Sequence, residues 1–60
     1  MRAMEIQDYA RKLLAQHGPG AIAEAAQKAL ALEKEGNDQD AENWRQITDA
    51  MKLMRGPHQS

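Results

Sequence analysis

Apolar residues recur every three or four positions along three stretches of the chain, which is the spacing of one face of a helix. This pattern predicts short helices over about residues 4–17, 19–35 and 38–55. In the first stretch, the apolar positions fill the i, i+3, i+4, i+7, i+8 template without a gap. They are Ile6, Tyr9, Ala10, Leu13 and Leu14. The chain is therefore predicted to be all-α.

Glycine and proline mark the two breaks between the predicted helices. Gly18 suits the left-handed position that follows a helix, and Pro19 suits a first helical turn, which needs no N–H from it. Gly36 has the same place after the second stretch, with Asn37 or Asp38 as the N-cap of the third. Both links are short, as expected between helices that pack against one another.

The second predicted helix is apolar over most of its circumference. Its apolar residues are Ala21, Ile22, Ala23, Ala25, Ala26, Ala29, Leu30, Ala31 and Leu32. Such a helix must be covered from more than one side, so we expect it to be the central helix of a small three-helix bundle, completed by association. We expect one helical domain over residues 1–55 and a short mobile tail over residues 56–60.

The apolar residues divide into a predicted core and a candidate interface. The core comprises Ile6, Tyr9, Leu13, Ile22, Ala26, Ala29, Leu30, Trp44 and Ile47. Further apolar residues exceed what a core of this size can hide, and we assign them to an interface. They are Met4, Leu32, Met51, Leu53 and Met54. In an up-down-up bundle, the methionines of the first and third helices lie at opposite ends. An antiparallel two-fold dimer would then cover both ends with one self-complementary patch.

Length and composition favour association. The chain has 60 residues and no cysteine, so disulfides and thiolate metal sites are excluded. A core of this size rarely supplies more than ~3–5 kcal/mol by itself. No apolar run approaches the ~20 residues of a membrane span. The first twelve residues include no apolar segment of signal-peptide length, so we expect a cytoplasmic protein.

Charge is unevenly distributed, although the net charge is only −1. The stretch from Glu33 to Glu42 holds five acidic residues against Lys34 alone, whereas bases dominate from Asn43 onwards. One interpretation is that acids at the start of the third helix and bases at its end follow the helix dipole. The other is that the acidic stretch meets a basic partner.

No set of residues fits a catalytic, cofactor or metal site. The two histidines, His17 and His58, belong to no metal-binding motif, and the only serine is Ser60. We therefore expect a protein that is not an enzyme and that holds no cofactor.

A small helix-turn-helix-like DNA-binding regulator is the alternative, because three short helices suffice for that fold. The third helix would be the reading helix, with Asn43, Arg45 and Gln46 as residue types that read base edges. A reading helix enters the groove with its N-terminal residues, and here these include Asp38 and Asp40. Nucleic acid is thus a disfavoured partner.

Three local motifs carry a resemblance to a protein family. They are His17-Gly18, Gly36-Asn37-Asp38 and Trp44-Arg45-x-Ile47. Together they resemble a group of short helical proteins of unknown function from alphaproteobacteria, over Ile6 to about Met54. The resemblance implies an all-helical fold and a bacterial cytoplasmic setting, without an activity, ligand or partner.

These observations lead to one expectation of function. We expect a small protein–protein interaction module that forms a homodimer and serves as an adaptor or regulator. Its partner is a second copy of the chain or another protein. Methionine is common at such binding surfaces because its side chain adapts to many shapes.

Overall fold

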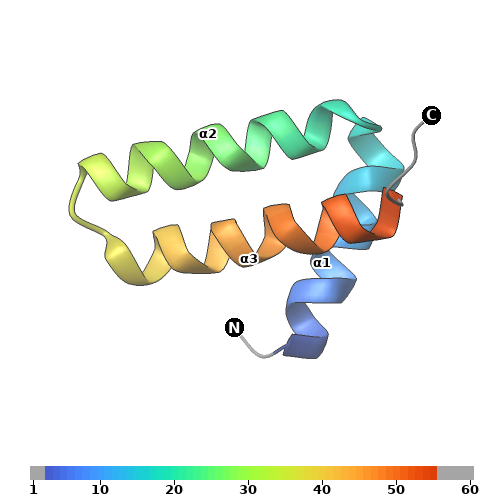
Figure 1. Ribbon diagram of the computed structural model, residues 1–60, viewed down its shortest axis with the longest axis horizontal. Coiled ribbons are helices and arrows are strands. Elements are labelled where there is room, and N and C mark those ends of the chain that lie inside the picture. Colours follow the sequence, from blue (N-terminus) through green and yellow to red (C-terminus); the bar gives the residue numbers. More distant parts are fainter. Residues whose placement is uncertain (1–2, 56–60) are drawn as a thin grey trace.

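The computed structural model describes residues 3–55, which form three helices and no strand (Figure 1). Helix α1 spans Ala3–His17, α2 spans Gly20–Lys34 and α3 spans Asp38–Arg55. The prediction of an all-α bundle of three short helices is confirmed. The predicted mobile tail lies outside the described residues.

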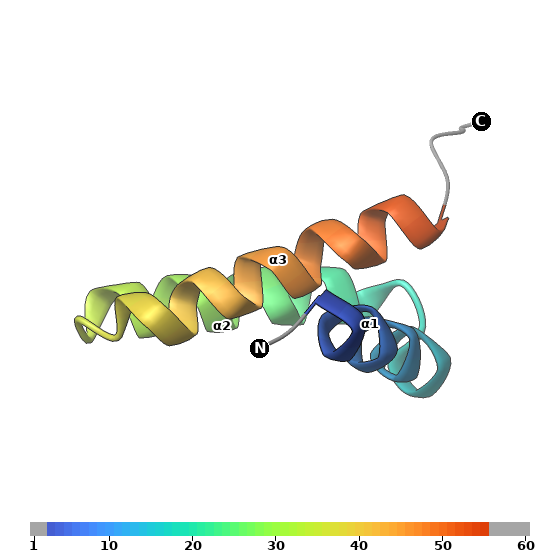
Figure 2. The same cartoon turned by 90° about the horizontal axis from the view of Figure 1, so that it is seen from below.

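Helices α2 and α3 form an antiparallel hairpin, and α1 crosses one face of it (Figures 1 and 2). The crossing lies at the end where α2 begins and α3 ends, and α1 makes most of its contacts with α3. The expected up-down-up order, with the first and third helices parallel, is therefore wrong. A crossing lets the short apolar stripe of α1 cover both partners at once, and Ala10 of α1 is fully buried there.

Alanines bring α2 close to its neighbours. Ala21, Ala25 and Ala29 recur every four residues along α2 and are all buried. An alanine side chain ends at Cβ, so a helix axis can approach closely along this stripe. Of the predicted core residues on α2, Ala29 is therefore buried as expected, whereas the buried stripe otherwise consists of Ala21 and Ala25 rather than Ile22, Ala26 and Leu30.

Leu30 was predicted in the core and instead is 57% exposed. It lies outside the alanine stripe of α2, where no helix covers it. Ile22 and Ala26 are half-buried, and Ile22 packs against the edge of the core. The larger side chains of Ile22 and Leu30 lie beside the stripe of buried alanines, because only an alanine side chain fits where α2 approaches its neighbours most closely.

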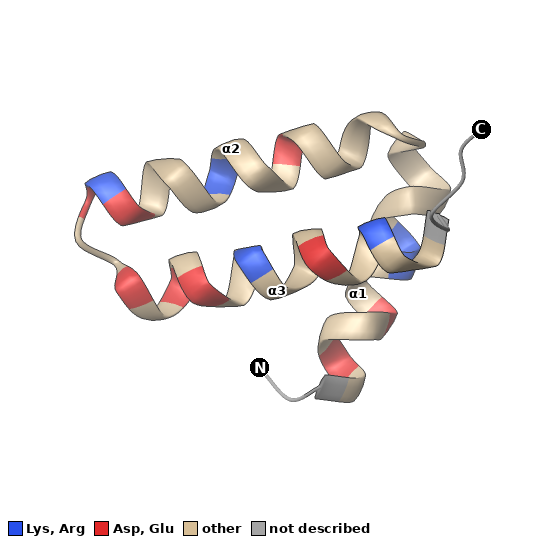
Figure 3. Ribbon diagram, in the orientation of Figure 1, with Lys and Arg blue, Asp and Glu red and all other residues tan. Residues whose placement is uncertain are grey.

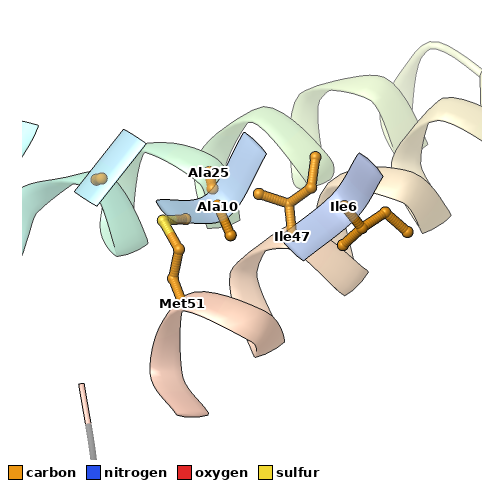
Figure 4. Close-up of a cluster of buried hydrophobic side chains, with 6 residues drawn as sticks. Ile6, Ala10, Ala25, Ile47 and Met51 are labelled. Carbon is orange, nitrogen blue, oxygen red and sulfur yellow. The ribbon is translucent and has the colours of Figure 1, made fainter. Parts of the chain in front are cut away.

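The core forms where the three helices meet (Figure 4). It consists of Ile6, Ala10, Ala21, Ala25, Ile47 and Met51. Met51 is completely buried, so its assignment to an interface is wrong. Because α1 crosses the C-terminal half of α3, it covers the Met51 side chain that an up-down-up bundle would leave near a rim.

The link between α2 and α3 is a Schellman turn. The N–H of Gly36 donates to the carbonyl of Glu33 at 3.1 Å, and the N–H of Asn37 donates to the carbonyl of Leu32 at 2.9 Å. Gly36 has a φ of 86°, a left-handed conformation that costs other residues energy. The carbonyl of Asn37 accepts the N–H of Ala41, which begins α3.

Substitution of alanine at two glycines should change stability in opposite directions. We expect Gly36→Ala to lower the free energy of unfolding by about 1–2 kcal/mol, because its φ is left-handed. Gly20→Ala should raise it by about 0.5–1 kcal/mol, because Gly20 is helical and a Cβ there meets nothing within 4 Å. Urea unfolding followed by circular dichroism measures both. Equal stability of the two variants would contradict the turn geometry.

Candidate interaction surfaces

Five large hydrophobic side chains remain exposed on the described part of the molecule. They are Met4, Tyr9, Leu30, Leu53 and Met54. Met4 is 81% and Leu53 is 83% exposed, which is nearly the exposure of an isolated side chain. Scattered apolar side chains are normal on a protein surface, but those that border a hollow are candidates for contact with a partner.

One hollow lies between α1 and α3, and we call it the α1–α3 groove. Its volume is about 240 Å³. It is lined by Gln7, Arg11, Ala50, Leu53 and Met54. Since Met4 lies one turn before Gln7 on α1, its exposed side chain extends this surface. The groove therefore brings together two of the five predicted interface residues, Leu53 and Met54, and Met4 lies one turn before it on α1.

The other two predicted interface residues lie elsewhere. Met51 is in the core, as described above. Leu32 is half-buried near the C-terminal end of α2, a part of the hairpin that α1 does not reach (Figure 1). The sequence could not have grouped these residues correctly, because their positions depend on where α1 crosses.

The second hollow lies where all three helices meet, and we call it the three-helix notch. Its volume is about 230 Å³. It is lined by Tyr9, Leu13, Ala21, Glu24, Ala25, Lys28 and Trp44. The two alanines are buried and small, and so a space remains between the larger side chains around them.

Two aromatic rings form one wall of the notch. Tyr9 and Trp44 meet edge to face, with ring centroids 5.7 Å apart and planes at 75°. Tyr9 was predicted in the core but is 37% exposed, because it lies at the flank of the inward face of α1. Trp44 and Leu13 are half-buried and pack against the edge of the core.

Lys28 and Glu24 supply the charges of the notch. The Lys28 ammonium lies 5.9 Å from the centre of the Trp44 ring, within cation–π range. Glu24 makes no ion pair or hydrogen bond with any other residue in the range 3–55. Sequence reasoning overlooked both residues. Their i, i+4 spacing beside the alanine stripe was the available signal.

Acidic residues gather at the opposite end of the hairpin, where α2 ends and α3 begins (Figure 3). There Arg45 forms ion pairs with Glu33 of α2 and with Glu42, the latter at 3.4 Å. The hydrogen bond that Arg45 donates to the Glu33 carboxylate, followed by the negative charge of Glu33, raises the pKa of Arg45 above its ordinary value. Arg45 therefore joins the two helices and has its charge compensated within the molecule.

Residues 3–55 contain neither a metal-binding cluster nor a membrane-spanning helix. No three His, Asp or Glu side chains of this range come together in a way that could hold a metal ion. None of the three helices, taken over the same range, is long and apolar enough to cross a bilayer.

The chain matches no known protein-family model, no curated protein and no solved structure. The two hollows and the side chains around them are therefore the features of the chain from which a function can be inferred.

Proposed function

We propose that this chain is a small, non-enzymatic protein–protein interaction module that acts as a homodimer, as an adaptor or regulator in a bacterial cytoplasm. The observation that supports this best is Leu53, a leucine 83% exposed at the edge of the α1–α3 groove. Met54 lines the same groove, and Met4 extends it. Together they form an apolar surface contributed by two helices.

The free energy gained by burying these side chains in a dimer is comparable to the free energy that association costs. Burial of a leucine or methionine side chain contributes ~1.5–3 kcal/mol. In a two-fold dimer the same patch is used twice, so the four strongly exposed side chains, Met4 and Leu53 of each copy, would supply roughly 6–12 kcal/mol. This is comparable to the association cost of about 4–15 kcal/mol. A domain this small gains stability from association that its own core supplies only in part.

A DNA-binding regulator has less support. In a helix-turn-helix, the two helices meet at about 90–120°, whereas α2 and α3 are antiparallel. The first turn of α3 carries Asp38 and Asp40, which would face phosphates. Arg45, a candidate for base contact, is paired with two carboxylates.

Charges placed in the α1–α3 groove should separate the dimer. We expect the Leu53→Glu, Met54→Glu double variant to sediment as a monomer and to melt at a lower temperature, because the two copies would oppose carboxylates across an apolar contact. Leu30→Glu is the matched control, since Leu30 is also exposed but lies on α2 away from the groove. It should remain dimeric. A wild-type protein that sediments as a monomer at high micromolar concentration would refute the homodimer.

A further inference from the structure

The three-helix notch has features of a binding site that the proposed homodimer does not use. We propose that the notch receives one large apolar side chain from a helix of a different protein, with an acidic residue of that helix facing Lys28 and a basic residue facing Glu24. This inference goes beyond the homodimer, because it concerns another surface and another partner.

The size of the notch fits a single side chain. Pockets for small molecules usually measure about 300–1,000 Å³, and the notch at about 230 Å³ is smaller. Its floor is apolar, since Ala21 and Ala25 lie there and are buried. Binding energy at protein interfaces concentrates where a large side chain fills such a hollow and excludes water.

The aromatic wall makes the notch preformed. Tyr9 and Trp44 come from different helices, and each ring limits the movement of the other through their edge-to-face contact. A partner that enters a preformed hollow loses less free energy to the ordering of side chains. Trp and Tyr are also the residue types that contribute most often to interface energy.

The two charged side chains at the rim of the notch determine which charges a partner must carry. Glu24 and Lys28 have the order and i, i+4 spacing of a stabilising helical ion pair, yet they do not pair. Lys28 lies over Trp44 instead, and Glu24 has no partner among residues 3–55. Lys28 also makes the ring face unsuitable for a second cation. The rim thus presents one positive and one negative group about one helical turn apart.

A partner helix antiparallel to α2 matches this rim. Its residue opposite Lys28 comes first along its chain and its residue opposite Glu24 follows about four positions later. For the antiparallel direction that we propose, the order is acid, then base, whereas a helix parallel to α2 would need the reverse order. The order of acid, then base, also stabilises an isolated helix. The apolar anchor lies between the two charges, on the side that faces the notch.

A second copy of this chain is a poorer occupant. In a two-fold contact, a hollow must be filled by a projecting side chain of the same surface patch. Leu53, the most exposed large apolar side chain among the described residues, lines the α1–α3 groove instead, and Met4 lies one turn before that groove on α1. The groove and the notch share no lining residue, and they use different residues of α1.

Three synthetic helical peptides, which differ in the order of their charges or in their apolar residue, test the proposal. The first probe is a helical peptide without Trp or Tyr that carries one leucine between a Glu and a Lys four residues later. The second has the Glu and Lys exchanged, and a third has alanine in place of the leucine. Trp44, the only tryptophan, reports binding through its fluorescence. The wild type should bind the first peptide about three- to ten-fold more tightly than the second, and the third should not bind measurably.

The Glu24→Lys, Lys28→Glu double variant should reverse the preference between the two charged peptides. Both positions are exposed, so circular dichroism should show an unchanged fold. Equal affinity of both peptides for both proteins, or binding that leaves Trp44 emission unchanged, would overturn the proposal. So would loss of self-association in this variant, because the notch would then be part of the contact between copies.

The same measurements separate this inference from the homodimer. The Leu53→Glu, Met54→Glu double variant should bind the first peptide as the wild type does, because neither residue lines the notch. Loss of peptide binding in that variant would contradict a separate site. A monomeric wild type that still prefers the first peptide would refute the homodimer and support the notch.

Discussion

Met51→Ala should lower the free energy of unfolding by about 2–5 kcal/mol, the usual cost when a large buried side chain is removed. Met51 is completely buried between α3 and α1, and the space it leaves cannot close without movement of the helices. A core of this size supplies only ~3–5 kcal/mol, so the variant should be partly or wholly unfolded. Chemical unfolding followed by circular dichroism measures the loss.

Two further variants make this prediction decisive. Met51→Leu keeps the volume and should cost less than about 1.5 kcal/mol, so it remains measurable if the alanine variant does not fold. Leu53→Ala, two residues further along α3, should change the stability of the monomer by less than about 0.5 kcal/mol, because Leu53 is 83% exposed. If Met51→Ala were as stable as Leu53→Ala, Met51 would have to lie on the surface, and the crossing of α1 would be wrong.

Ala25→Leu should destabilise the protein by about 1–3 kcal/mol through overpacking. Ala25 is 2% exposed and lies in the cluster that joins all three helices, so three additional carbons would force the helix axes apart. A lower midpoint of thermal or urea unfolding records the loss. The expected cost is a large share of a marginal stability.

Ala23→Leu is the matched control, because the same substitution is made two residues away on the exposed side of α2. It should leave the unfolding midpoint nearly unchanged, since leucine and alanine differ little in helix propensity. The comparison also tests which face of α2 is buried. A face centred on Ala26 would instead make Ala26→Leu the more damaging substitution, whereas the structure predicts a milder effect at this half-buried position.

The crossing of α1 also explains where the α1–α3 groove and the three-helix notch form. Helix α1 lies across the hairpin and not along it (Figures 1 and 2), and a hollow borders each of its two flanks. The α1–α3 groove lies on one flank and the three-helix notch on the other. Both proposed interactions therefore depend on one feature of the fold. A variant that shifts α1 should impair dimer formation and peptide binding together.

The sequence by itself determined the three helices and the breaks between them. Helix periodicity and the left-handed preference of glycine are properties of short segments, and so the expected helix ends agree with α1, α2 and α3 to within one residue. The positive φ values of Gly18 and Gly36 follow from the same local preference.

Only the tertiary structure decided which of several apolar faces is buried. On α2, most faces are apolar, and the alanine stripe prevails over the face with Leu30 because close helix contacts admit only small side chains. On α3, the direction of α1 decides that Met51 lies in the core while Leu53 remains exposed. Residues such as Tyr9, at the flank of an apolar face, are buried or exposed according to the crossing of the helices. A crossing angle arises from the sizes of side chains on all three helices together, and no single segment of the sequence contains that information.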